Sequence, residues 1–260
     1  MSEHGTRESR RRAAEQARLA RQRRSRRRRL ALACGAAVVV AAAGIGIGLG
    51  VSGSGASVSG SGASLPGTYA PLSTLGHLTA APAPGPFGPE NVPIPGAPAL
   101  AGPSAATAGQ MIDGIGCQTS EQTVFHIHTH LTIFVNGQQK QVPAAIGIPG
   151  AVATQTSAGP FIEAGQCFYW LHTHAADGII HIESPVQRSY TLGEFFDEWG
   201  QPLSSDQVGP AHGKVTVIVN GRVFTGNPRD VPLGSHENLQ LDVGTPLVQP
   251  ETINWGITGL

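Results

Sequence analysis

The chain has 260 residues and a formal net charge of zero, yet residues 1–29 carry 12 arginines and three glutamates, a net charge of +9. The remaining residues carry a net charge of −9, and such segregation of charge points to a membrane or a nucleic acid as partner. No aromatic residue lies among the arginines, so we expect no nucleic-acid binding, and the absence of a phosphate-binding loop after a strand argues against nucleotide binding.

Residues 30–51, LALACGAAVVVAAAGIGIGLGV, form an uncharged run that predicts a single transmembrane helix. At a rise of 1.5 Å per residue such a helix is about 33 Å long, enough for a hydrocarbon core of about 30 Å. The Arg-rich tail, residues 1–29, should then stay in the cytoplasm on the anionic inner leaflet. The expected localisation is the cell membrane, with the C-terminal domain outside the cytoplasm.

Other interpretations of this N-terminal part stay open. It could be a cleaved signal peptide, and residues 25–30, SRRRRL, loosely resemble a twin-Arg export signal. If the helix spans a membrane, the alternating glycines from Gly44 to Gly50 supply GxxxG spacings through which two copies could form a homodimer.

Residues 52–110 are rich in Gly, Ser, Pro and Ala, and Glu90 is the only charged residue among them. A segment of this composition buries too little apolar surface to offset its loss of conformational entropy, so we predict a disordered linker. Its proline-rich second half should be a stiffer, polyproline-like spacer.

Residues 111–250 are predicted to form one extracytoplasmic domain, followed by a C-terminal tail at residues 251–260. Two alternating apolar runs end in Asn-Gly, at residues 136–137 and 220–221, which is typical of β-hairpins with tight turns. The similar strings TIFVNG and TVIVNG hint at an internal duplication.

One short helix is predicted at about residues 191–199, because Thr191 and Glu194 form a capping box and Gly200 is a suitable stop. A last strand is expected around residues 238–243. The predicted fold class is therefore α+β and β-rich: one antiparallel sheet or a small barrel of hairpins with a short helix, preceded by the transmembrane helix and the disordered linker. The hairpin–helix–hairpin order also suggests a β-grasp-like arrangement.

Cys117 and Cys167 lie outside the predicted transmembrane helix, each a few residues before a histidine-rich segment. Outside the cytoplasm we expect them to form a disulfide, which could join neighbouring strands. Ligation of a metal by their thiolates is the alternative.

The first histidine cluster is FHIHTHL, residues 125–131. Because side chains alternate along a strand, His126, His128 and His130 should share one face, and the apolar residues of the run should share the core face.

The second cluster is WLHTHAADGIIHIE, residues 170–183, with a turn signal at Asp177-Gly178. A two-residue turn there would bring four polar side chains to one face of a hairpin. The predicted cross-strand pairs are His174 with His181 and His172 with Glu183.

Imidazoles converging from separate strands, with one carboxylate, are typical ligands of a transition metal. We expect Zn²⁺ or Cu²⁺, with Ni²⁺ and Fe²⁺ as alternatives, while a polar face that only titrates or hydrogen-bonds is the competing interpretation. His212 and His236 are weaker candidates, and the pattern assigns no catalytic residue. The predicted metal ligands are His126, His128, His130, His172, His174, His181 and Glu183.

The string FYWLHTHAADGIIHIESP, followed by TLGEFFDEWGQPL, resembles membrane-anchored or exported bacterial proteins that carry the same two histidine clusters. The resemblance covers about residues 117–245 and implies a shared domain, without an assigned activity.

Three functions are compatible with these features. The first is a single-pass, membrane-anchored domain that binds a transition metal for buffering, sensing or delivery. The second is an exported metalloenzyme in which three histidines leave a coordination position for water or oxygen, with Glu183 as general base if it is not a ligand. The third is a pH-responsive or protein-interaction domain without a metal.

Overall fold

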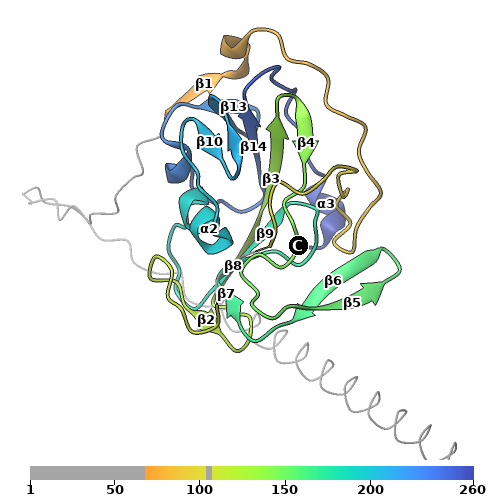
Figure 1. Ribbon diagram of the computed structural model, residues 1–260, viewed down its shortest axis with the longest axis vertical. Helices are drawn as coiled ribbons and strands as arrows, with labels where there is room; N and C mark the ends of the chain where they lie inside the picture. Colours follow the sequence, from red (N-terminus) through yellow and green to blue (C-terminus); the bar gives the residue numbers. More distant parts are fainter. Residues whose placement is uncertain (1–67, 104–106) are drawn as a thin grey trace, which may run out of the picture. The chain divides into compact units, whose positions relative to one another are not determined.

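The computed structural model describes residues 68–103 and 107–260, shown as coloured ribbon in Figure 1. The predicted cytoplasmic tail, the predicted transmembrane helix and the first part of the predicted linker lie outside these residues. Within the two described ranges, no helix combines the length and the apolar character needed to cross a membrane.

One mixed sheet organises the fold (Figure 1). Its strands are β1 (Tyr69–Pro71), β3 (Phe125–Val135), β4 (Gln138–Lys140), β8 (Leu171–His172), β9 (Ile179–Ser184), β12 (Val215–Val219), β13 (Arg222–Phe224) and β14 (Glu237–Val243). They lie in the order β1-β13-β12-β14-β3-β9-β8, and β4 pairs with the C-terminal half of β3.

The remaining elements are short. They are the pairs β2 (Cys117–Gln118) with β7 (Phe168–Tyr169), β5 (Val152–Thr156) with β6 (Gly159–Ala164), and β10 (Gln207–Val208) with β11 (Ala211–His212), together with helices α2 (Leu192–Trp199) and α3 (Trp255–Thr258) and the 3-10 turns η1 (Leu72–Leu75) and η2 (Pro228–Asp230).

The predicted antiparallel sheet or small barrel is wrong, because β14 runs parallel to β3 over seven residue pairs, from Glu237 opposite Thr129 to Val243 opposite Val135. A parallel neighbour requires a long crossover, and here α2 and the β12–β13 hairpin lie between the two strands in sequence. The inner order β4-β3-β14-β12-β13, with the parallel pair in the middle, is the strand order of a β-grasp-like sheet.

Both predicted Asn-Gly turns are confirmed. Asn136 and Gly137 have φ angles of 49° and 74°, and Asn220 and Gly221 have φ angles of 47° and 74°. Two successive positive φ angles are those of a type I′ turn, whose twist matches the flanking strands. These turns therefore set the registers of the β3–β4 and β12–β13 hairpins.

The predicted short helix is also confirmed as α2. The Thr191 side chain accepts a hydrogen bond from the Glu194 amide, the Glu194 carboxylate accepts one from the Thr191 amide, and Gly200 ends the helix in a left-handed conformation. Phe195, Phe196 and Trp199 are fully buried and belong to one hydrophobic core with the apolar residues of the sheet. Helix α2 therefore covers one face of the sheet.

The predicted disordered linker is wrong for residues 68–103. Strand β1 pairs with β13, Thr79 exchanges backbone hydrogen bonds with the C-terminal segment, and Leu100 donates to the carbonyl of Gln141. In Figure 1 this stretch runs from β1 past β4 towards α3. Its order comes from neighbours elsewhere in the chain, which satisfy its backbone groups and bury its Val92 and Leu100.

Candidate metal centre

The two histidine clusters meet on the face of the sheet opposite α2. Strand β9 lies between β3 and β8, and His128 of β3 is directly opposite His181 of β9. Because residues alternate along a strand, the neighbouring apolar positions, such as Ile180 and Ile182, enter the core instead. Three adjacent strands thus present histidines to one region.

The predicted pairing of the second hairpin is wrong by two residues. His172, not His174, lies opposite His181 in the β8–β9 ladder. The reason is that His174 leaves this ladder and joins β6: the Ile162 amide donates to the His174 carbonyl. A shift of two residues preserves the faces of a strand, so the side chains still converge.

The ligand atoms gather into two sets, each with all its members within 4.8 Å of one another. The imidazoles of β3 form one close pair, with 3.1 Å between the Nε2 atoms of His126 and His128. Those of residues 172 and 174 form another, also with 3.1 Å between Nε2 atoms. The two sets are His126, His128, His181 and Glu183, and His172, His174, His181 and Glu183.

Hydrogen bonds to backbone carbonyls determine which nitrogen carries the proton in the second pair. The Nδ1 atom of His172 lies 2.8 Å from the Tyr169 carbonyl oxygen, and the Nδ1 atom of His174 is hydrogen-bonded to the Ile162 carbonyl oxygen. A carbonyl oxygen only accepts, so each Nδ1 must donate, and each neutral ring then has a lone pair at Nε2. Two lone pairs facing each other at 3.1 Å repel unless a cation lies between them.

Burial keeps most of these rings neutral, as metal ligation requires. Burial and the nearby His181 and His126 lower the pKa of His128 to about 3. Burial, with the neighbouring His174 and His181, also lowers the pKa of His172 well below its usual value.

His181 and Glu183 form the charged part of the centre. Burial alone would lower the pKa of His181, but hydrogen bonds to Glu183 and Glu90 raise it to about 9. Burial would raise the pKa of Glu183, yet its hydrogen bonds with His126 and His181 hold that pKa below its usual range. In the absence of a metal, a protonated His181 therefore lies between two carboxylates.

Sequence reasoning missed Glu90. Its side chain is buried, with Oε1 2.7 Å from His181 Nε2. By accepting from Nε2, Glu90 leaves His181 Nδ1 to face the other ligands, with Glu183 Oε1 3.4 Å away. The available signal was that Glu90 is the one charge in an otherwise uncharged stretch.

His130 was predicted as a ligand, but it belongs to neither set. Its Nε2 lies 3.0 Å from the Asp177 carbonyl oxygen, beneath the turn at Gly178. Of the two weaker candidates, His212 is exposed on β11, whereas His236 stacks on Trp255 beside the centre.

A cavity of about 540 Å³ opens onto the centre. Both ligand sets contribute to its wall, and Glu121, which sequence reasoning also missed, lies at its edge with Oε1 3.5 Å from His174 Nε2. The C-terminal residues 258–260 line the cavity as well. The centre is therefore accessible to ions and small molecules.

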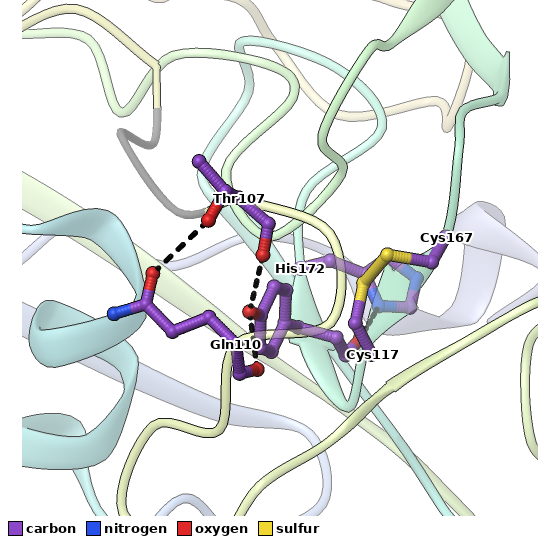
Figure 2. The surroundings of a disulfide bond; sticks show 6 residues. Thr107, Gln110, Cys117, Cys167 and His172 are labelled. Atoms are coloured by element: carbon purple, nitrogen blue, oxygen red, sulfur yellow. Dashed lines mark hydrogen bonds between the residues drawn. A yellow bond between two sulfur atoms is a disulfide. The ribbon is translucent and has the colours of Figure 1, made fainter.

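Cys117 and Cys167 form a disulfide next to the centre (Figure 2). Cys117 pairs with Tyr169 in the β2–β7 ladder, and the Tyr169 carbonyl accepts from His172. The Tyr169 hydroxyl in turn donates to the backbone carbonyls of Thr107 and Gln110. The disulfide thus braces the strand that orients His172, and neither sulfur is a free thiolate.

Comparison of the chain with protein-family models, with curated proteins and with solved structures gives no match.

Proposed function

We propose that this chain is an extracytoplasmic protein that binds a divalent transition metal through the histidines of β3, β8 and β9, for metal buffering, sensing or delivery. The observation that carries the proposal is the pair His172 and His174, whose Nε2 lone pairs face each other at 3.1 Å. A shared cation removes their repulsion, and a separation of about 3.3 Å is expected for two nitrogens that each lie about 2.05 Å from one tetrahedral ion.

The donor types favour Zn²⁺ or Cu²⁺. Five imidazoles and one carboxylate suit these ions, whereas Cu⁺ prefers thiolates and thioethers. The cysteines are paired with each other, and Met111 is exposed and lines neither set. Ni²⁺ and Fe²⁺ also bind imidazole and carboxylate ligands and are the alternatives.

The disulfide supports a location outside the cytoplasm, where such bonds form and persist. An ion in that compartment reaches the centre through the cavity. An accessible, histidine-rich centre is suited to exchanging its metal.

Elemental analysis and competition titration of the full-length chain test the proposal. We expect bound Zn²⁺ or Cu²⁺ after dialysis, with an affinity that falls at least about 100-fold in H172A/H174A, because two ligands of one set are lost. The matched control is H212A, since His212 is exposed and remote from both sets. Absence of bound metal, or an equal loss in H212A, would contradict metal binding.

A second candidate, a metalloenzyme, is favoured by the cavity. A centre that opens into about 540 Å³ has room for a water ligand and a small substrate. X-ray absorption of the loaded protein would distinguish the two: a light-atom ligand in addition to the protein nitrogens and oxygens is expected for an enzyme, and a fully protein-ligated ion is expected for a carrier.

A further inference from the structure

We propose that the centre holds two metal ions, one on the histidines of β3 and one on those of residues 172–174, bridged by Glu183. This inference rests on the proposed function and extends it from one ion to a binuclear site.

The ligands of the two sets come from different strands. The two sets share only His181 and Glu183, which belong to the central strand β9. His126 and His128 lie on one flanking strand, while His172 and His174 lie on or directly after the other. Adjacent strands are about 4.8 Å apart, so the outer pairs approach the middle from opposite sides.

Each of the two imidazole pairs has the spacing of two ligands of one ion. The Nε2 atoms are 3.1 Å apart within each pair, a spacing that suits two ligands of the same ion. An ion on the β3 pair would leave the lone pairs of His172 and His174 still facing each other. A single ion on the β3 pair would therefore leave the second pair uncompensated.

Glu183 belongs to both ligand sets. Its Oε1 lies 3.1 Å from His126 Nε2 and 3.4 Å from His181 Nδ1, whereas its Oε2 is buried with no hydrogen-bond partner. A carboxylate shared by two ligand sets is suited to bridge two ions, which in such sites lie about 3.5–4 Å apart. His181 serves one ion only, because its Nε2 is bonded to Glu90.

Nearby carboxylates offset the charge of two ions. Glu183 lies in the centre, Glu90 contacts His181, and Glu121 lies 3.5 Å from His174 Nε2. Each of these three carboxylates is a ligand or contacts a ligand. Their combined negative charge is larger than a single divalent cation needs for neutralisation.

The experiment is Zn²⁺ and Cu²⁺ loading of the full-length chain, with metal content per chain and the metal–metal distance as readouts. We expect two Zn²⁺ per chain, zinc–zinc scattering at about 3.5–4 Å in X-ray absorption, and a spin-coupled Cu²⁺ signal in paramagnetic resonance. H126A/H128A and H172A/H174A should each retain one ion, whereas Glu183→Gln should weaken both sites together.

The outcomes separate the two proposals. One ion per chain with no metal–metal scattering would overturn the binuclear site and leave metal binding intact. Two ions without coupling would overturn the Glu183 bridge, and no bound metal would overturn both proposals. The distance measurement on the unsubstituted chain decides the question even if a double variant does not fold.

Discussion

The two halves of the central sheet begin from similar sequences but treat their polar side chains differently. TIFVNG lies in β3, TVIVNG lies in β12, and both strands flank β14 and end in the same type of turn. On β14 the buried Gln240 donates to the Val248 carbonyl and to Asp242, so the C-terminal segment supplies partners for that half. On β9, the side chains of His181 and Glu183 contact each other and line the cavity.

The two regions therefore differ in what covers them: the C-terminal segment exchanges hydrogen bonds with Gln240, whereas the polar side chains of β9 face one another and the cavity. The substitutions below follow in order of decreasing expected effect.

Removing the disulfide should have the largest effect. The bond closes a loop of 50 residues, and its loss in C117A/C167A should lower the free energy of unfolding by about 4 kcal/mol on the chain-entropy model. Because the bond also braces Tyr169, the metal affinity should fall as well. Denaturant unfolding and metal titration of the oxidised and substituted chains check this. An unchanged affinity would show that the disulfide does not help to position the metal ligands.

The second largest effect should come from a substitution on β14, at Asp242. Burial raises the pKa of Asp242 from 3.8 to about 6, because the folded state favours the protonated carboxyl. The free energy of unfolding therefore has its full value below pH about 4 and falls as the pH rises through about 6. D242N should therefore be more stable than the unsubstituted chain at pH 8, by up to about 3 kcal/mol, and equally stable near pH 4.

Thermal unfolding from pH 4 to pH 8 measures this difference. D206N changes an exposed aspartate and is the matched control, for which we expect no comparable gain. Metal binding by D242N should be unaltered, and a change in affinity would show that the two halves are coupled.

Glu90→Gln should weaken metal binding by about 10- to 100-fold, the usual cost of removing the partner that orients a ligating histidine. The physical reason is the loss of the charged acceptor of His181 Nε2. Competition titration checks it against E163Q, in which the carboxylate is exposed on β6. Equal affinities for the two variants would contradict the orienting role of Glu90.

The smallest effect should come from the helix shared by both halves. T191A removes the side-chain acceptor of the Glu194 amide and should lower the free energy of unfolding by about 1 kcal/mol. T191S retains a hydroxyl and should lose little. Neither change should alter the metal content, since α2 covers the opposite face of the sheet.

Local chemistry determined the elements that could be predicted. Asn-Gly requires positive φ angles that few other dipeptides accept, and the Thr191–Glu194 capping box satisfies its own backbone groups. Both signals act within four residues, so the turns and helix α2 follow from the sequence. The common face of His126 and His128 likewise follows from the alternation of a strand.

Only the tertiary structure decided which strands are neighbours and what covers them. The parallel pairing of β3 with β14, the departure of His174 from the β8–β9 ladder and the burial of Glu90 each depend on partners that are distant in sequence. The composition of residues 68–103 predicts disorder because it reflects only the apolar surface that the segment can bury within itself. The segment is ordered because the sheet and the C-terminal segment supply hydrogen-bond partners and bury its surface. These partners are distant in sequence, so no local pattern predicts them.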